Sequence, residues 1–384
     1  MLGFLQEESN SGFPNSQSLW LHAVSFGETK IALEFLKEGI QNQSVPTNIC
    51  FTTTIEDAMI WFQQESKTLS PHVSIYCYFL PLDCLPVMFY FIHKIKAKSL
   101  FLSETDFWPS ILWLCKQKKI PVYLINGRIS KTLSNNLLRF QKSSIKMLQA
   151  IDLCFVQYPN DKSKLEGLIK QDNIHVYGNA KFDLLHPQAL NEKYSALKLN
   201  DRQACVLGSF HPDECKLFLT VFKQFSSQLL FVIAPRNLNS ITALKLMLDK
   251  NKLSYDLSSQ IPSLESKKDI IILDEMGVLS SLYQYCNISV IGGSFNQVGG
   301  HNFLEPILYK KPVFVGPFFR NFEHDIQEFL KLNYIWQVSN EKEISRHFTD
   351  YLNNPKPYIE SSLKANQHLK SHQGVLQKTW NKIN

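Results

Sequence analysis

The sequence predicts an α/β fold of two domains, each built on a parallel sheet. Short apolar segments alternate with amphipathic helical segments along most of the chain, and this alternation is typical of parallel strands covered by helices. The alternation stops over a polar, proline-containing stretch at 186–203 and then restarts. A length of 384 residues allows two domains with a core each.

The N-terminal half begins with a predicted strand at 20–24, a turn at 25–27 and an amphipathic helix that starts at Glu28 and ends at Gly39. A carboxylate in the first turn of a helix is stabilised by the helix dipole by about 0.3–1 kcal/mol, so Glu28 needs no catalytic role to explain its presence. Further strands are predicted at 48–53, 73–79, 99–103, 121–125, 153–157 and 175–177.

Polar side chains follow two of these strands. Glu104 and Asp106 come after one strand, and Asn126 and Arg128 come after the next. Ligands collect at the carboxyl ends of parallel strands, which makes these residues candidates for a site. An ion pair between the acids and Arg128 is the simpler interpretation, because such pairs are common in structures without catalytic use.

A basic stretch at 86–148 carries nine Lys and two Arg against two acids, whereas the whole chain has a net charge of only +6. It contains an apolar, aromatic helix at 86–98, and Arg139, Lys142 and Lys146 follow at helical spacing. Such asymmetry predicts an anionic partner, either a membrane surface or nucleic acid, with a solvated basic face as the alternative. Aromatic and basic side chains together favour anionic lipid, and no known nucleic-acid-reading motif is present.

The second half repeats the alternation and ends in a glycine-rich loop. Its strands are predicted at 204–208, 229–234, 270–273, 288–291 and 312–315. Glycines at 292, 293, 299 and 300 separate the strand at 288–291 from a predicted helix at 302–311. Glycines permit close backbone approach, and a helix N-terminus attracts phosphate or carboxylate, so we favour an anionic ligand here. The loop matches neither GxxxxGK[ST] nor GxGxxG, and Asn302 with Glu305 also forms an ordinary N-cap pattern.

The cysteines, the N-terminal residues and the length of the apolar runs limit the class of protein that this sequence predicts. Eight cysteines are scattered without a CxxC pair or a Cys/His cluster, which indicates reduced thiols of a cytosolic protein and no structural metal. The N-terminus lacks the cationic region and long apolar core of a signal peptide. Because no apolar run reaches the ~18 residues that span a bilayer, we expect a soluble or peripheral protein.

An ordered set of motifs resembles the Kdo transferases of lipopolysaccharide synthesis, which are two-domain GT-B glycosyltransferases. The motifs are HAVSFGE at 22–28, SETDFWP at 103–109, NGRIS at 126–130, GNAKFD at 178–183, GSFHPDE at 208–214, APR at 234–236, DEMG at 274–277, GGSFNQVGGHNFLEP at 292–306 and GPFFRNF at 316–322. The resemblance covers about residues 19–330. The chain departs from the usual family pattern at Gly127, Asn237 and Val278, where Ala, His and Glu are usual.

The resemblance implies a GT-B fold whose two Rossmann-like domains face each other across a cleft. The expected divisions are an acceptor domain at 1–187, a CMP-Kdo-binding domain at 188–357 and a C-terminal helix at 358–384, a candidate strap across the domain junction. It implies transfer of 3-deoxy-D-manno-octulosonic acid (Kdo) from CMP-Kdo to the lipid A precursor lipid IVA. The reaction that the resemblance implies inverts the anomeric centre, and we expect it to need no metal or cofactor. The protein would act on the cytoplasmic face of the inner membrane, as a peripheral protein on an anionic surface.

The resemblance also implies roles for individual residues. Glu28 is the catalytic base, with Glu104, Asp106 and Arg128 on the acceptor side. The donor-binding residues it implies are Lys181, Ser209, His211, Arg236, Met276, Gly300, Asn302 and Glu305.

Two other classes of function stay open. A GT-B-type sugar-nucleotide epimerase shares the fold and the glycine-rich second domain, but it has no use for a basic, aromatic surface on the first domain. A non-catalytic protein that binds anionic lipid or nucleic acid would use the basic stretch alone.

Overall fold

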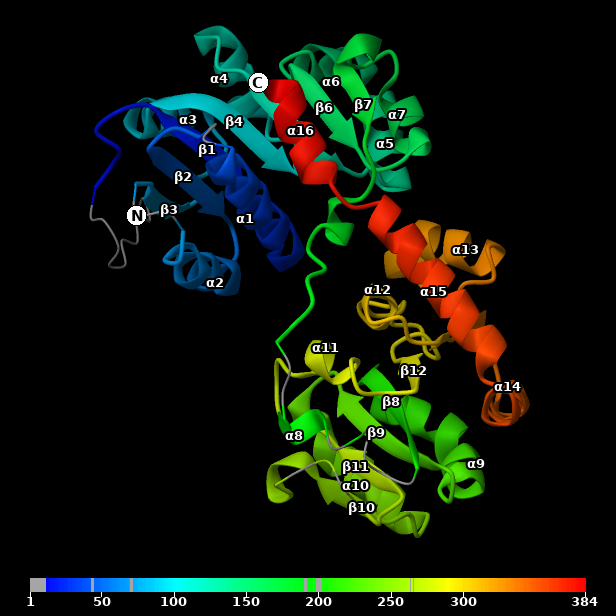
Figure 1. The fold of residues 1–384 in the computed structure, drawn as a ribbon. Helices are drawn as coiled ribbons and strands as arrows, with labels where there is room; N and C mark the ends of the chain where they lie inside the picture. The colour runs from blue at the N-terminus through cyan, green and yellow to red at the C-terminus, as the bar shows by residue number, and fades with distance from the viewer. Residues whose placement is uncertain are drawn as a thin grey trace. The chain divides into compact units, whose positions relative to one another are not determined.

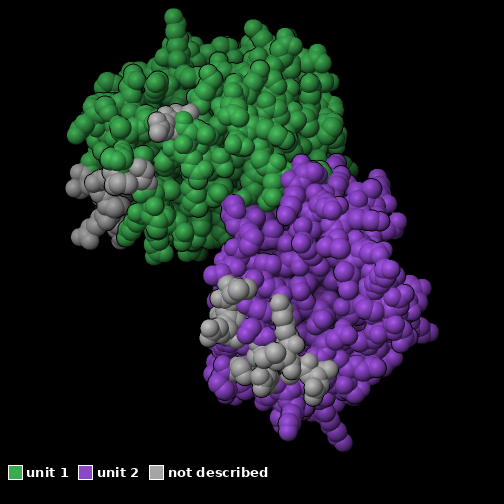
Figure 2. Space-filling view, viewed as in Figure 1, with its two compact units in different colours: residues 1–184, 372–384 green, residues 185–371 purple. Residues whose placement is uncertain are grey.

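The computed structural model describes residues 12–42, 45–69, 72–189, 192–195, 197, 202–262, 264 and 266–384. The chain divides into two compact units (Figures 1 and 2), unit 1 with residues 1–184 and 372–384 and unit 2 with residues 185–371. Each unit contains a seven-stranded sheet, and the strand pairs in both sheets are parallel. The predicted α/β class with two parallel sheets is therefore confirmed. Part of the expected linker, at 190–191, 196 and 198–201, lies outside the described residues.

The sheet of unit 1 has the strand order β3-β2-β1-β4-β5-β6-β7. Its strands are β1 (Ser18–His22), β2 (Asn48–Thr53), β3 (Ser74–Phe79), β4 (Ala97–Ser103), β5 (Val122–Gly127), β6 (Leu153–Val156) and β7 (Ile174–Val176). β2 and β3 lie on one side of β1 in the sheet, and β4 to β7 lie on its other side. Such a reversal of strand order leaves a crevice at the carboxyl ends of the two central strands, here β1 and β4.

Helices cover both faces of this sheet. They are α1 (Phe26–Gln41), α2 (Glu56–Ser66), α3 (Leu85–Ile95), α4 (Pro109–Lys118), α5 (Lys131–Arg139), α6 (Gln141–Leu148) and α7 (Pro159–Leu165). Successive side chains of β1 enter different cores: Trp20 packs in one and Leu21 in the other. A strand buried on both faces needs an unbroken apolar run, which is why β1 shows no polar alternation.

The basic stripe expected at Arg139, Lys142 and Lys146 does not lie on one helix. α5 ends at Arg139, and Phe140 leaves the helical conformation with φ −110° and ψ 38° before α6 begins. Helical spacing predicted a shared face, but the chain bends between the first residue and the other two.

The sheet of unit 2 has the order β10-β11-β9-β8-β12-β13-β14. Its strands are β8 (Gln203–Phe210), β9 (Leu229–Pro235), β10 (Tyr255–Leu257), β11 (Ile270–Ile272), β12 (Ile288–Ile291), β13 (Val313–Val315) and β14 (Trp336–Gln337). The strand order reverses between β8 and β12, so the crevice expected of this topology lies at their carboxyl ends. The sequence did not predict β10 and β14, edge strands too short to show a pattern.

The helices of unit 2 are α8 (Glu192–Ser195), α9 (Cys215–Phe225), α10 (Ile241–Lys250), α11 (Leu279–Leu282), α12 (Leu304–Leu308), α13 (Glu323–Lys331), α14 (Glu341–Asn353) and α15 (Lys356–Ser371). α12 is shorter than the helix predicted at 302–311. It ends early because Lys310 adopts a left-handed backbone with φ 58°, which cannot continue a right-handed helix.

The C-terminal tail forms two helices where a single helix at 358–384 was expected. α15 belongs to unit 2, and α16 (Val375–Ile383) belongs to unit 1 and packs against α1 (Figure 1). The helices are separated at Gly374, whose φ of +86° favours glycine. The Asp183 carboxylate accepts hydrogen bonds from the backbone N–H groups of Gly374 and Leu376, each at 2.7 Å, and so caps α16.

In the described part of the chain, no helix combines the length and the apolar character that crossing a bilayer requires.

Candidate active site

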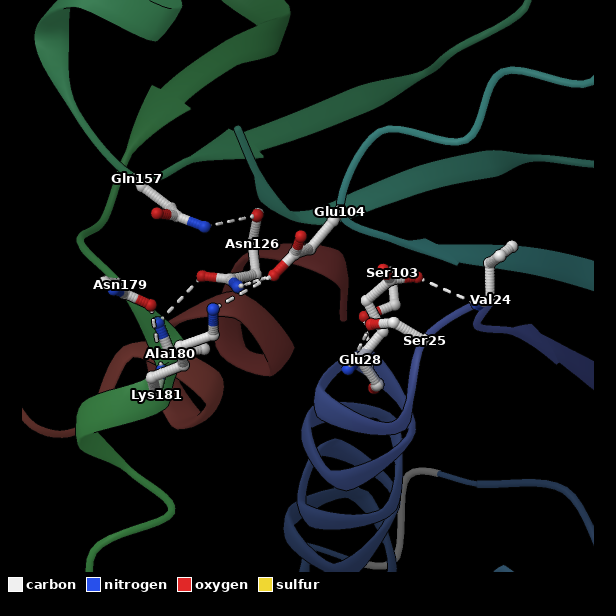
Figure 3. A network of polar contacts seen from close by, with 10 residues as sticks. All are labelled: Val24, Ser25, Glu28, Ser103, Glu104, Asn126, Gln157, Asn179, Ala180 and Lys181. Atoms are coloured by element: carbon white, nitrogen blue, oxygen red, sulfur yellow. Dashed lines mark hydrogen bonds and ion pairs between the residues drawn. The ribbon is translucent and has the colours of Figure 1, made fainter. Parts of the chain in front are cut away.

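Glu28 lies in the first turn of α1, directly beyond the carboxyl end of β1 (Figure 3). Ser25 caps the helix and accepts a hydrogen bond from the Glu28 N–H at 3.2 Å. The Glu28 side chain turns back, and its Oε2 accepts a hydrogen bond from the Val24 N–H at 2.8 Å. This reciprocal arrangement resembles a capping box. Glu28 therefore stabilises the N-terminus of α1, whether or not it also takes part in catalysis. It also fixes the carboxylate at the crevice between β1 and β4.

Glu104 enters the same crevice from the end of β4. Its Oε1 lies 3.7 Å from Lys181 Nζ and 3.5 Å from Asn126 Nδ2. Asn126 is itself fixed, because its Oδ1 accepts a hydrogen bond from the Ala180 N–H at 2.8 Å (Figure 3). Glu104 and Asn126 both have left-handed backbones, with φ 59° and 55°. A left-handed backbone at a non-glycine residue is strained and persists only where surrounding contacts hold it. Such residues cluster at functional sites.

The expected ion pair between these acids and Arg128 is wrong. Among the described residues, the salt-bridge partner of Glu104 is Lys181, and Arg128 is exposed and in no ion pair. The cause is the fold, because the segment after β7 brings Lys181 beside β4. Lys181, which the resemblance assigned to the donor, thus contacts an acceptor-side residue within unit 1.

The carboxylates of Glu28, Glu104 and Asp106 influence one another electrostatically. Burial raises the pKa of Asp106 to about 6, and the negative charge of Glu28 adds to the increase. Burial also raises the pKa of Glu104, which the charge of Lys181 opposes and that of Glu28 reinforces. A carboxylate that titrates near neutrality is suited to accept a proton. Asp106 is therefore a second candidate base beside Glu28.

His22 and Trp108 are buried polar groups of this region that the sequence reasoning did not single out. His22 is the last residue of β1, and its Nδ1 lies 2.9 Å from Thr52 Oγ1 and 3.1 Å from the Thr52 carbonyl oxygen. Burial lowers its pKa to about 4, so the imidazole is neutral at physiological pH. His22 Nε2 and Trp108 Nε1 have no hydrogen-bond partner in the described part of the chain. Their presence in the HAVSFGE and SETDFWP motifs was the available signal.

A second group of site residues lies at the crevice of unit 2. Arg236 directly follows β9, and its N–H donates to the Phe210 carbonyl oxygen at 3.0 Å. His211 follows β8, and its Nε2 lies 2.8 Å from Nε2 of His301, with the ring centroids 5.1 Å apart and the ring planes within 5° of each other. The sequence reasoning named His211 and Arg236 but missed His301, although it lies in the GGHN segment of the quoted motif.

The glycine-rich loop reaches this crevice because two positions lack a side chain. A Cβ at Gly292 would lie 2.4 Å from the Ser209 carbonyl oxygen, and one at Gly293 would lie 2.7 Å from the His301 ring. Gly300, with φ +75°, closes the loop through its N–H, which donates to the Gly293 carbonyl oxygen at 2.7 Å. Ser209 itself has a left-handed backbone with φ 53°.

Asn302, Glu305 and Met276, which the resemblance also assigns to the donor, lie on two further segments of unit 2. The Asn302 side chain bonds Glu305 Oε1 through Nδ2 at 2.9 Å and accepts the Leu304 N–H through Oδ1 at 3.1 Å. Asn302 thus stabilises the turn before α12, and the N-cap expected at Asn302 lies one residue later, at Phe303. Met276 lies on the turn after β11 and is 66% exposed, an unusual state for a methionine.

Comparison with known proteins places the chain. Residues 2–184 match the family model described as 3-Deoxy-D-manno-octulosonic-acid transferase (kdotransferase). The 3-deoxy-D-manno-octulosonic acid transferase of Chlamydia trachomatis serovar D is 27% identical over 374 residues, which cover 94% of this chain and 84% of the relative. The chain is therefore similar to the Kdo transferases over most of its length. Each of its two units is a parallel α/β unit, and the fold is GT-B-like.

Two further matches, one curated protein and one solved structure, differ in the activity they are named for. A bifunctional glycosyltransferase/methyltransferase of Fusobacterium nucleatum is 29% identical over 348 residues, and the match covers 87% of this chain. The chain spans only about half, 52%, of the length of that relative. A UDP-GlcNAc 2-epimerase from Neisseria meningitidis, solved with UDP-GlcNAc, superposes with a TM-score of 0.59 at 14% identity, over 94% of this chain and 100% of that one. The fold alone therefore does not separate a transferase from an epimerase.

Proposed function

We propose that this protein is a Kdo transferase, which transfers Kdo from CMP-Kdo to lipid IVA by single displacement, with inversion and without a metal. The observation that carries the proposal is the carboxylate cluster of Glu28, Glu104 and Asp106 at the strand-order reversal of unit 1, where parallel sheets bind ligands. The lipid hydroxyl that attacks the donor must lose its proton, so a side chain that can take up a proton is required at such a position.

Glu28 is the proposed base. One carboxylate oxygen is held by the Val24 N–H, which orients the group, and within the described residues Glu28 forms no ion pair that would hold its charge. Glu104 is engaged by Lys181 at 3.7 Å, so accepting a proton there would weaken this ion pair. We assign Glu104, Asp106 and Arg128 to support of the acceptor.

The donor is proposed to bind unit 2 at the crevice between β8 and β12. Arg236 and His211 supply positive charge or N–H donors to the phosphate, and the glycine loop offers backbone at close range. Stabilising the charge that develops on departing CMP is the largest contribution such a site makes to catalysis. Met276, Gly300, Asn302 and Glu305 are the other proposed nucleotide contacts in unit 2, and Ser209 is proposed to lie near the phosphate or the sugar acid. Lys181, which the resemblance placed with them, is in unit 1 and pairs with Glu104.

The test is release of CMP from CMP-Kdo by purified protein, measured with and without lipid IVA. We expect release that depends on the lipid, with Kdo appearing on it. An epimerase would convert a sugar nucleotide without any lipid acceptor, and a binding protein would release no CMP. Either result would contradict the proposal.

Replacing Arg236 with Ala is expected to weaken CMP binding by about 10- to 100-fold, since a charge-assisted hydrogen bond contributes roughly 1.5–3 kcal/mol. The measurement is titration calorimetry with CMP. Lys250→Ala, which removes an exposed cation of α10, is the matched control and should bind CMP as the parent does. Unchanged CMP affinity in Arg236→Ala would make Arg236 a structural residue.

We further propose that unit 1 attaches peripherally to the cytoplasmic face of the inner membrane through a surface formed by α3, α4 and the loop before α3, here called the α3/α4 surface. Its exposed apolar side chains are Leu82, Leu85, Phe89, Tyr90 and Trp113. Lysines accompany them: Lys118 lies 4.2 Å from the Phe89 ring centroid and Lys94 lies 5.4 Å from that of Tyr90. Amphipathic surfaces of this composition bind anionic lipid headgroups.

The α3/α4 surface predicts salt-sensitive binding to anionic vesicles. Binding should fall as salt rises, because exposed charges are screened within ~10 Å at 0.1 M ionic strength. The double change Phe89→Ser and Tyr90→Ser should reduce co-sedimentation with vesicles several-fold, whereas Leu246→Ser, at a comparably exposed apolar residue of α10 in unit 2, should not. Equal binding of the parent to neutral and anionic vesicles would rule out the electrostatic contribution.

A further inference from the structure

We propose that His211 and His301 act as one proton-sharing pair that takes up a proton when the phosphate of a cytidine nucleotide binds beside Arg236. This inference rests on the proposed donor site and adds to it a residue, His301, and a coupling between donor binding and pH.

The distance between the two rings limits the protons that the pair can hold. The Nε2 atoms are 2.8 Å apart, which is a hydrogen-bond distance, so one nitrogen carries a hydrogen and the other offers a lone pair. Two neutral imidazoles satisfy this arrangement, and so does one imidazolium donating to a neutral imidazole. Two imidazolium ions do not. The pair therefore accepts one extra proton without breaking its hydrogen bond.

The pair is built by several elements of unit 2. His211 is held by its backbone N–H, which donates to Glu214 Oε2 at 2.9 Å. His301 packs where Gly293 has no side chain, since a Cβ there would come within 2.7 Å of the ring. The two histidines follow β8 and β12, the strands between which the order of the sheet reverses. A ligand at that crevice would meet the pair.

Charged groups on two elements face the pair. Arg236, after β9, acts on both rings, and its positive charge together with burial keeps them neutral in the free protein. Burial and the charge of Arg236 lower the pKa of His301 to about 4. Burial lowers the pKa of His211, with Arg236 adding to this and Asp213 opposing it. Glu214 is the other titratable neighbour, and burial raises its pKa to about 7 although backbone N–H groups bind it.

A bound phosphate reverses this balance. Its negative charge offsets that of Arg236 and favours an imidazolium at the pair, so the histidine pKa rises on binding. A group whose pKa is higher in the complex strengthens binding below that pKa, and the gain disappears as the pH rises above it. CMP should therefore bind more tightly at mildly acidic than at mildly alkaline pH.

The test is calorimetric titration of the full chain with CMP, in buffers of different ionisation enthalpy. Working at about pH 7.5 keeps the CMP phosphate largely dianionic, because its second pKa is about 6. We expect net proton uptake when the parent binds CMP, of at most one proton and smaller as the pH is raised. Cytidine, which lacks the phosphate, should bind without uptake.

Variants assign the proton to the pair. His211→Gln with His301→Gln should still bind CMP, more weakly, but with little proton uptake, and His301→Gln alone should reduce the uptake. His347→Gln is the matched control. Burial also lowers the pKa of His347, which lies on α14 with its Nδ1 2.9 Å from the Tyr358 hydroxyl of α15. That variant should behave as the parent does. Thermal unfolding of each variant establishes that it is folded.

Three results would overturn the proposal. CMP binding by the parent without proton uptake would refute it and leave the proposed donor site standing. Uptake that persists in the double variant would place the proton on another group, such as Glu214. A folded parent that binds no CMP would contradict both this inference and the proposed function.

Discussion

Glu28→Gln is expected to lower the rate of Kdo transfer by about 10²- to 10⁴-fold, the usual contribution of a positioned general base. The amide keeps the size of the side chain but cannot accept a proton from the lipid hydroxyl. The measurement is single-turnover transfer with donor and acceptor saturating. CMP affinity should be unchanged, because the nucleotide is assigned to unit 2.

Two matched variants separate the base from its neighbours. Glu104→Gln and Asp106→Asn remove the other carboxylates and should reduce transfer less than Glu28→Gln does. The Glu28 variant should stay folded, since the lost helix-dipole interaction costs no more than about 1 kcal/mol. If Glu28→Gln keeps a rate within a few-fold of the parent, the role passes to Asp106, whose pKa of about 6 suits a base, or to Glu104.

Trp380→Ala is expected to destabilise unit 1 by about 3–5 kcal/mol, the range for removing a large buried aromatic side chain. Trp380 is 2% exposed and stacks on Phe35 of α1 at 4.4 Å and 11°. Its Nε1 donates to the Phe35 carbonyl oxygen, and Gly39 leaves space for its ring. The substitution removes these contacts and opens a cavity between α16 and α1.

Hydrogen exchange of α1 amides, alongside urea unfolding, measures this effect, because a chain of two units need not unfold in one step. Lys378→Ala, an exposed position of the same helix, is the control and should change stability by less than about 0.5 kcal/mol. Equal protection of α1 in Trp380→Ala and the parent would show that α16 contributes little to unit 1.

The Trp380 prediction depends on contacts between distant parts of the chain, and the sequence pattern does not reveal such contacts. The partner of Glu104 proved to be Lys181 and not the nearer Arg128, because the return of the chain after β7 decides which cation reaches β4. His301 was missed as the partner of His211, from which it is 90 residues distant. The Trp380 bond to Phe35 spans 345 residues. A periodic pattern reports only burial along one segment and carries no information on such pairs.

The sequence by itself determined the α/β class, most strands and the motifs that carry the family resemblance. Strand β12, expected at 288–291, matches to the residue, because a buried parallel strand requires an unbroken apolar run that glycines then end. Tertiary structure alone decided the short edge strands β10 and β14, the bend at Phe140 and the early end of α12. These depend on neighbours in space and on single backbone conformations, such as the left-handed Lys310, which side-chain periodicity does not encode.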